Sequence, residues 1–226
     1  MIKEQLQHFW QELKPFEAKL IPVSKTKSNE EVMEAYNAGN KVFGENKVQE
    51  LATKQSELPE DIEWHYIGHL QRNKVKYIAP FVHLIHAVDS LRLLNMINKE
   101  AKKNERTISC LLQIHIASEE SKFGIDESGV FELIKNADWT QLTNIRVVGL
   151  MGMATFTDDQ EQVRNEFKKL AAIKENLNSK ELPNNVEIKE LSMGMTNDYK
   201  IALEEGSTMI RIGTAIFGAR PCMIPT

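Results

Sequence analysis

The chain has 226 residues, of which 42% are hydrophobic and 27% charged, and its formal net charge is −4. This balance is typical of a globular protein and excludes a bulk basic field that would attract nucleic acid or anionic lipid. No apolar run approaches the roughly 18 residues of a membrane-spanning helix, and the N-terminal stretch lacks the apolar centre of a signal peptide. We therefore expect a cytoplasmic protein with no membrane partner and no nucleic-acid partner.

The two cysteines indicate a reducing compartment, because they form neither a CxxC motif nor a disulfide framework. Cys110 lies in the apolar run "ISCLLQIHI" and is predicted to be a core residue. Cys222 lies near the end of the chain, and we expect it to have no functional role.

Short apolar runs alternate with longer amphipathic segments along the whole chain. A helix is predicted over 2–17, and the pattern then predicts strand and helix pairs. In chain order these pairs are 19–24 and 29–39, 41–45 and 47–58, 62–68 and 70–80, 82–88 and 90–104, 107–117 and 127–137, 144–153 and 158–177, and 186–193 and 198–206. The eighth strand is predicted over 208–213, followed by a short helix or loop over 214–220.

Eight strands alternating with helices predict a parallel sheet with right-handed crossovers. Eight such units in this length fit a closed (β/α)₈ barrel, here a single domain over 1–226 with an extra N-terminal helix. The alternative is an open doubly wound sheet, which fits six or seven strands better. No GxGxxG follows the first strand, which argues against a dinucleotide-binding fold.

Lys25 follows the apolar run of the first predicted strand, in "LIPVSKTK". A lysine at the end of a core strand loses hydration unless it has a role there. One interpretation is an ordinary surface lysine just past the strand, and the other is a reactive amine. The barrel favours the second, because chemistry in this fold gathers at the carboxyl ends of the strands.

The seventh and eighth predicted strands end in glycines with hydroxyl residues, which suit an anion. Ser192 and Gly194 lie at the end of the seventh strand, and Gly213 and Thr214 lie at the end of the eighth, at the start of a possible short helix. Many barrels bind phosphate at this place, although ordinary turns also use these residue types. Arg211 favours the anion site, because an arginine on the inner face of a barrel needs a partner; the alternative is an outward-facing arginine paired to a helix.

The first and eighth strands of a closed barrel are neighbours, so Lys25, the anion site and Arg211 are expected to line one mouth. A ligand that uses all three has an aldehyde, a phosphate and an acceptor ring nitrogen. Pyridoxal 5′-phosphate has these three groups.

Seven stretches together resemble the YggS/PROSC family of pyridoxal phosphate homeostasis proteins: "VSKTK", "FGENKVQE", "WHYIGHLQRNK", "SKFGI", "GLMGM", "LSMGMTND" and "STMIRIGTAIFGAR". The resemblance covers nearly the whole chain and implies a barrel like the N-terminal domain of alanine racemase, the fold type III barrel of pyridoxal phosphate proteins. It implies that Lys25 holds the cofactor as an internal aldimine and that Arg211 faces the pyridine nitrogen. It further implies that Asn46 lies near the ring, and that the phosphate is held by Ser192, Gly213 and Thr214, with Met193 lining the phosphate loop through its backbone. Lys47 and Thr196 depart from the family pattern outside these positions.

The family resemblance implies a carrier that holds and releases pyridoxal phosphate, with apo-enzymes as possible recipients. Only six residues follow Arg220, so we expect no C-terminal β domain of the kind that supplies the second acid/base group in racemases. One alternative is a weak racemase-like enzyme with His65 or Tyr66 as a second base. Another is an aldolase-type lysine that uses no cofactor.

Two further predictions concern residues outside this set. His65 and His69 are four apart, but no HExxH and no third ligand accompany them, so no metal site is expected. Lys122 is either a solvated loop lysine or a second, weak site for pyridoxal phosphate. The protein is expected to be a monomer.

Overall fold

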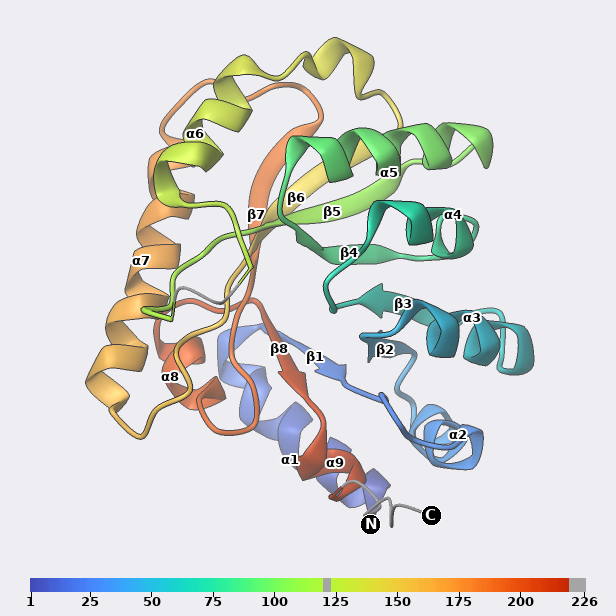
Figure 1. Cartoon of the computed structure of the whole chain (residues 1–226). Helices are drawn as coiled ribbons and strands as arrows, with labels where there is room; N and C mark the ends of the chain where they lie inside the picture. Colours follow the sequence, from blue (N-terminus) through green and yellow to red (C-terminus); the bar gives the residue numbers. More distant parts are fainter. Residues whose placement is uncertain (120–122, 220–226) are drawn as a thin grey trace.

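Eight strands run parallel and alternate with helices in the computed structural model, which describes residues 1–119 and 123–219 (Figure 1). Lys122 and Cys222 lie outside the described residues. The strands are β1 (Lys19–Pro22), β2 (Val42–Glu45), β3 (Glu63–Tyr66), β4 (Leu84–Val88), β5 (Ile108–Gln113), β6 (Ile145–Met151), β7 (Val186–Ser192) and β8 (Met209–Ile212). The α-helices are α1 (Ile2–Leu13), α2 (Asn29–Asn37), α3 (Val48–Glu57), α4 (Val75–Ile78), α5 (Leu91–Lys103), α6 (Glu127–Asn136), α7 (Gln160–Asn178), α8 (Tyr199–Glu204) and α9 (Thr214–Phe217). Short 3₁₀ helices are η1 (Lys14–Phe16), η2 (Arg72–Lys74) and η3 (Trp139–Gln141).

The strands follow the order β1-β8-β7-β6-β5-β4-β3-β2, so the first and last strands of the chain are neighbours. Leu20 pairs with Ile210 and Ile21 with Arg211 in the β1–β8 ladder. The two ends of the sheet meet where Val23 bridges to Gly44, just beyond β1. The predicted barrel is therefore confirmed over the open doubly wound sheet, although an isolated bridge rather than a continuous ladder joins the ends of β1 and β2 in the described part of the chain.

Local sequence signals explain where the helices begin. Ser28 and Glu31 form a capping box at the start of α2, and the Ser90 hydroxyl caps α5 as predicted. The predicted helix over 2–17 instead divides into α1 and η1, because Pro15 has no N–H to continue the α-helical hydrogen bonds.

Two predicted elements are shorter than expected. The helix predicted over 70–80 is divided between η2 and the four-residue α4. The strand predicted over 107–117 ends at Gln113, because the chain then leaves the barrel: Ile114 bridges to Ile125, and the His115 N–H donates to the Ile125 carbonyl oxygen.

Apolar side chains pack on both sides of the strands. The interior of the barrel holds a small cluster formed by Ile21, Leu84, Ala87, Leu111, Met151 and Met209. A larger core lies between the strands and the surrounding helices and includes Cys110, whose predicted burial is confirmed. Burial raises the pKa of the Cys110 thiol, which makes it unreactive.

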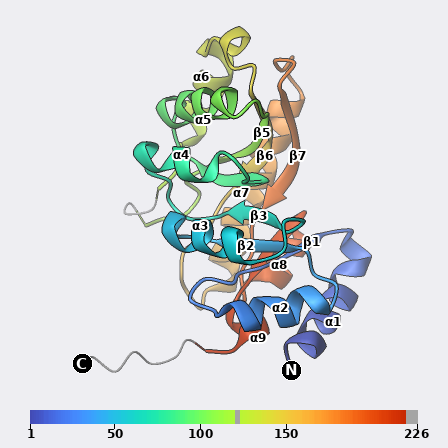
Figure 2. The ribbon, with the colours of Figure 1, turned by 90° about the vertical axis from the view of Figure 1, so that its right-hand side faces the viewer.

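Helices surround the barrel on its outside, and α9 packs against α1 (Figures 1 and 2). In the part of the chain that the structure describes, no helix combines the length and the apolar character needed to cross a bilayer.

Candidate functional site

Lys25 lies where the structure brings β1, β2 and β8 together. The N–H of Val23, just past β1, donates to the Ile212 carbonyl oxygen at 2.8 Å, and the Ser24 N–H donates to the Gly44 carbonyl oxygen at 3.1 Å. Lys25 follows directly and is half-buried. The carboxyl ends of three strands thus fix the backbone that leads into this lysine.

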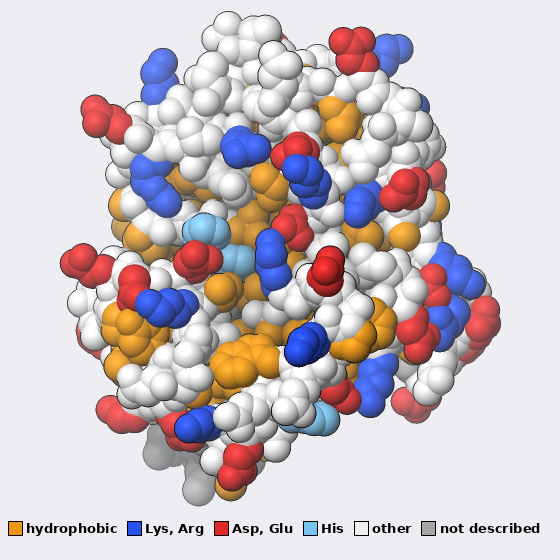
Figure 3. All heavy atoms as spheres, turned by 180° about the vertical axis from the view of Figure 1, so that it is seen from behind, with side chains coloured by type: hydrophobic (Ala, Val, Ile, Leu, Met, Phe, Trp, Pro, Cys, Tyr) orange, Lys and Arg blue, Asp and Glu red, His pale blue; other side chains and the backbone are white. Residues whose placement is uncertain are grey.

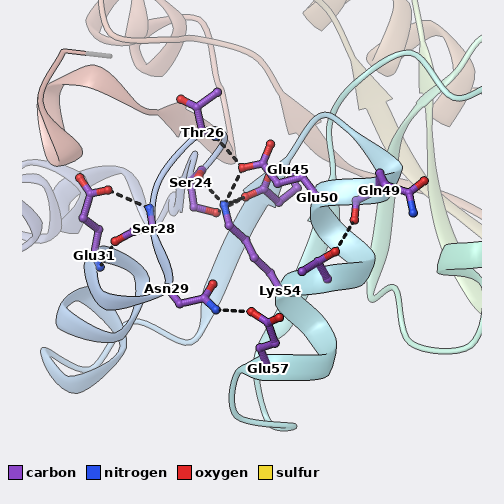
Figure 4. Close-up of polar contacts among 11 residues, drawn as sticks. Ser24, Thr26, Ser28, Asn29, Glu31, Glu45, Gln49, Glu50, Lys54 and Glu57 are labelled. Atoms are coloured by element: carbon purple, nitrogen blue, oxygen red, sulfur yellow. Dashed lines mark hydrogen bonds and ion pairs between the residues drawn. The ribbon is translucent and has the colours of Figure 1, made fainter. Parts of the chain in front are cut away.

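A buried ion cluster formed by Glu45, Glu50 and Lys54 supports the backbone next to Lys25 (Figure 4). The Lys54 ammonium donates to Glu45 Oε1 at 2.7 Å and to Glu50 Oε1 at 2.8 Å. It also donates to the Ser24 carbonyl oxygen at 2.7 Å, and the Ser24 hydroxyl donates to Glu45 Oε1 at 2.7 Å. This cluster therefore fixes the peptide unit that joins Ser24 to Lys25.

The residues that follow Lys25 are fixed as well. The Thr26 N–H donates to Glu50 Oε1 at 2.6 Å, and Thr26 has a left-handed φ of 65°. The Lys27 ammonium lies 3.2 Å from Glu31 and donates to the Phe217 carbonyl oxygen in α9 at 2.7 Å. Hydrogen bonds thus fix the backbone on both sides of Lys25, which reduces the backbone freedom that would otherwise be lost on ligand binding.

Glu45 is fully buried, and it has spare hydrogen-bonding capacity. Burial raises the pKa of its carboxyl group, and the Lys54 charge opposes that shift. Its Oε2 atom has no hydrogen-bond partner among the described residues. Buried acceptors rarely stay unpaired, so the cluster can accept one more donor from a ligand or a water molecule.

Arg211 points into the barrel, as the anion-site interpretation requires. Its Nη1 donates to the Ser192 hydroxyl oxygen at 2.6 Å and to the Ser192 carbonyl oxygen at 2.8 Å, and its Nη2 donates to the Gly152 carbonyl oxygen at 3.3 Å. Burial lowers the pKa of the guanidinium to about 10, so the group is still a cation at neutral pH. The outward-facing alternative is wrong, because Arg211 is only 4% exposed.

A chain of buried polar side chains continues from Ser192 through the barrel. The Ser192 hydroxyl oxygen lies 2.8 Å from His86 Nδ1, and His86 Nε2 lies 3.0 Å from His65 Nδ1. Burial lowers the pKa of both imidazoles, that of His65 to about 3, so both rings are neutral at physiological pH. This chain joins the carboxyl end of β7 to the interior faces of β3 and β4.

The other predicted site residues lie at the same end of the barrel. Gly213 comes next to Val23, where an added Cβ would meet the Val23 side chain at 3.5 Å. Thr214 opens α9 and is exposed, and Asn46, which follows β2, is half-buried. Met193 is fully buried; its N–H donates to the Met209 carbonyl oxygen at 3.2 Å, and its carbonyl oxygen accepts a bond from the Ser207 hydroxyl.

The residues proposed for a racemase-like base have other partners. The Tyr66 hydroxyl donates to the carbonyl oxygens of Asn46 and His69, each at 3.1 Å, and burial raises the pKa of Tyr66 to about 12. His65 is hydrogen-bonded to His86 inside the barrel. Both side chains are therefore held by hydrogen bonds, Tyr66 to two backbone carbonyl oxygens and His65 to a second imidazole.

Sequence reasoning missed His86 and Lys54 as parts of this site. His86 lies in the apolar strand segment "LIHAV", and Lys54 lies in the amphipathic helix segment "VQELATKQSE". Neither pattern indicates a functional residue. One signal was available for His86, because a histidine in a wholly buried strand needs a hydrogen-bond partner.

The donor set fits a phosphorylated aldehyde. Lys25 offers an amine, Thr214 offers an exposed hydroxyl group, and Ser192 offers a buried hydroxyl group that also contacts Arg211 and His86. The first N–H groups of a helix such as α9 have no intrahelical acceptor, and Arg211 offers a cation next to Ser192. These groups come from β1, β7 and β8, which are consecutive in the sheet.

Comparison with known proteins gives the same fold and a set of close relatives. The family described as "Alanine racemase, N-terminal domain" matches residues 1–221. The pyridoxal phosphate homeostasis protein of Aquifex aeolicus strain VF5 is 42% identical over 204 residues, which cover 90% of this chain and 87% of that protein.

Solved structures agree with this family. PipY of Synechococcus elongatus PCC7942, solved without PLP, is 33% identical with a TM-score of 0.89, covering 96% of this chain and 100% of that chain. Its structure with PLP bound has a TM-score of 0.85. Alanine racemase from Bartonella henselae has a TM-score of 0.70 at 17% identity and covers 100% of this chain and 63% of that chain, a similarity that supports the fold alone.

Proposed function

The chain belongs to the alanine racemase N-terminal domain family, and from this premise we propose that it binds pyridoxal phosphate at the carboxyl end of its barrel and acts in pyridoxal phosphate homeostasis. The observation that carries this proposal is the junction of β1 and β8. Lys25 follows β1, and β1 pairs with β8. Strand β8 contains Arg211 and is followed by Gly213.

Lys25 is the covalent attachment point in this proposal. When bound, the cofactor supplies an electrophilic aldehyde, and a lysine amine is the group that captures it. The cluster of Glu45, Glu50 and Lys54 holds the backbone on the amino side of Lys25, so the amine is presented from a fixed position.

The phosphate and the ring are bound by groups from β7, β8 and α9. The hydroxyl groups of Ser192 and Thr214, together with the first N–H groups of α9 after Gly213, bind the phosphate. Arg211 faces the ring nitrogen, and its retained positive charge opposes protonation of that nitrogen. Asn46 lies beside the ring, and Met193, whose side chain is buried, lines the phosphate loop through its backbone.

A ring nitrogen kept unprotonated withdraws electrons weakly, so this arrangement favours holding the cofactor over transforming a substrate on it. We propose that the protein stores and releases pyridoxal phosphate as a monomer in the cytoplasm, with apo-enzymes as recipients. Size-exclusion chromatography with light scattering tests the monomer.

Borohydride reduction of the purified full-length protein, followed by peptide mass mapping, tests the site. We expect a pyridoxyl adduct on Lys25 and a visible absorption band before reduction. Both are expected to be lost in Lys25→Ala and kept in Lys47→Ala, which removes an exposed lysine from the start of α3. An adduct confined to another lysine, or a colourless protein after incubation with pyridoxal phosphate, would overturn the proposal.

The same preparations separate a carrier from a racemase-like enzyme. A carrier transfers its cofactor to an apo-enzyme and shows no turnover of alanine or serine above background. Turnover that is lost in Lys25→Ala would instead support the enzyme.

A further inference from the structure

Three potential metal ligands meet at the amino end of the barrel, opposite to the mouth that contains Lys25. Glu63 is the first residue of β3, His65 lies two residues further along, and His83 directly precedes β4. One ligand atom from each of these side chains lies within 4.8 Å of the other two. From this cluster, called here the floor cluster, we propose that the chain binds a divalent transition-metal ion, with Zn²⁺ as the best fit.

The chemistry of the floor cluster selects the class of metal. Two imidazoles and one carboxylate suit Zn²⁺ and its first-row neighbours better than Mg²⁺ or Ca²⁺, which prefer oxygen ligands. Three protein ligands leave a fourth position of a tetrahedral site for water. This position is open to solvent, because the side chains of Glu63 and His83 are 49% and 53% exposed.

The geometry is close to that of a bound site. His83 Nε2 and a Glu63 carboxylate oxygen are 3.7 Å apart, and a His65 ring nitrogen lies within 4.8 Å of both of these side chains' ligand atoms. Tetrahedral Zn²⁺ with bonds of about 2.0–2.2 Å places its ligand atoms about 3.5 Å from one another. The separation between His83 and Glu63 is already near this value, and the exposed side chains of Glu63 and His83 have to move closer to His65 when an ion binds.

The third ligand, His65, is fixed by hydrogen bonds behind it. His65 Nδ1 lies 3.0 Å from His86 Nε2, which leaves His65 Nε2 as the atom that faces the floor cluster. Metal-binding histidines usually donate their second ring N–H to a partner, and that partner is His86 here. His86 Nδ1 in turn lies 2.8 Å from the Ser192 hydroxyl oxygen, so the orientation of both rings is set from inside the barrel.

The positive charge of Lys19, which lies near the floor cluster, is compensated by the carboxylate of Glu190. Lys19, the first residue of β1, is close enough to act on His65, but its ammonium forms an ion pair with Glu190 at 2.6 Å. Figure 3 shows histidine side chains gathered with acidic and basic side chains near the middle of one face of the molecule. The floor is therefore a mixed polar surface rather than a cationic one that would repel a metal ion.

Isothermal titration calorimetry with Zn²⁺ alone tests the site on the full-length protein after dialysis against a chelator, without added pyridoxal phosphate. We expect one ion per chain. The single variants His83→Ala and Glu63→Gln change exposed side chains and are expected to bind at least about tenfold more weakly, because even the loss of an outer partner costs about 10–100-fold. His8→Ala is the matched control, since His8 is an exposed histidine on α1 with a side chain 57% exposed, and its binding should equal that of the original protein.

Titration with Co²⁺ provides a second readout that depends on ligand geometry. Intense visible absorption of a four-coordinate Co²⁺ complex is expected in the original protein and in His8→Ala, and its loss in His83→Ala. Absence of stoichiometric Zn²⁺ binding, or binding that is equally strong in His83→Ala and Glu63→Gln, would overturn the proposal. Either result leaves the assignment of Lys25 untouched, because that assignment is tested by the pyridoxyl adduct.

Discussion

Arg211 donates to the hydroxyl oxygen of Ser192 across 2.6 Å, inside the barrel and between neighbouring strands. The same hydroxyl lies 2.8 Å from His86 Nδ1, so one small side chain joins a buried cation to a buried imidazole. In the proposed site Ser192 also contacts the phosphate. Its hydroxyl group therefore both binds the cofactor and connects Arg211 to His86.

Ser192→Ala is expected to lower both stability and cofactor affinity. The substitution removes a partner from Arg211 and from His86, and an unpaired buried group costs about 1–3 kcal/mol in free energy of unfolding. Loss of one charge-assisted contact to phosphate is expected to weaken pyridoxal phosphate binding about tenfold or more. Urea denaturation and fluorescence titration measure the two effects.

Ser207→Ala is the control for Ser192→Ala. Ser207 is also buried, but its hydroxyl donates to the Met193 carbonyl oxygen at 2.7 Å and contacts other backbone carbonyls. It should lose stability, and its cofactor affinity should fall less than that of Ser192→Ala, because the Ser207 hydroxyl supports the backbone of Leu191 and Met193 but does not contact the phosphate. Equal cofactor affinities in the two variants would contradict the phosphate role of Ser192.

Lys54→Met is expected to be strongly destabilising, because it leaves the Glu45 carboxylate buried without its cation. Side chains of Lys54 and Glu45 are 5% and 0% exposed, and breaking one partner of such a pair typically costs about 3–5 kcal/mol. Thermal and urea unfolding measure the loss. Lys54→Met combined with Glu45→Gln should recover part of it, since the uncompensated charge is gone.

An exposed ion pair supplies the comparison for Lys54. Lys41→Met breaks the pair between Lys41 and Asp61, which are 57% and 49% exposed, and should change stability little, because solvent screens an exposed pair. A loss of similar size in Lys54→Met would contradict the structural role of the buried cluster. Of Lys54→Met and Lys41→Met, only Lys54→Met should attach pyridoxal phosphate more slowly, because the Ser24 carbonyl oxygen next to Lys25 then loses its hydrogen bond from the Lys54 ammonium.

Acid is expected to destabilise the fold steeply, through His65 and His86. The pKa of His65 is lowered from 6.5 to about 3 in the folded protein, so between these values the unfolded chain binds a proton that the folded chain does not. Stability therefore rises with pH across this window and is lost as pH falls below about 6.5. Each such histidine contributes a slope of about 1.4 kcal/mol per pH unit.

Urea midpoints measured from pH 4.5 to 7.5 in the presence of a chelator check this slope. His86→Phe should have a shallower slope than the original protein, whereas His8→Ala, which changes an exposed histidine, should match it. A slope unchanged in His86→Phe would show that the acid sensitivity arises elsewhere.

Gly68→Ala is expected to displace Asn46. An added Cβ at position 68 would lie 2.3 Å from the Asn46 carbonyl oxygen, so the backbone that carries Asn46 has to move. Such overpacking typically costs about 1–3 kcal/mol. Pyridoxal phosphate affinity should fall as well, because Asn46 is placed beside the ring.

Gly206→Ala separates backbone strain from displacement. Gly206 has a φ of +91° with nothing within 4 Å of an added Cβ, so the variant is strained by roughly 1–3 kcal/mol but moves no neighbour. It should lose stability and bind the cofactor normally. Weaker cofactor binding in Gly206→Ala would indicate that affinity follows global stability rather than the position of Asn46.

The sequence by itself determined the barrel and the residues at the ends of its strands. Alternating strand and helix patterns are local, and side chains at carboxyl strand ends meet in any parallel barrel, so Lys25 and Gly213 follow from the order of the chain. Arg211 could be selected because a cation in an apolar strand needs a partner, although which way it faced was open.

The tertiary structure alone decided which polar groups pair inside the barrel. His86 and Ser192 are 106 residues apart, and no local pattern links them; the barrel interior brings their strands face to face. The same holds for the floor cluster, where His83 joins Glu63 and His65 from the next strand. Such pairing depends on which face of the sheet each side chain points to. A shift of one residue in the register between strands would turn these side chains to the opposite face.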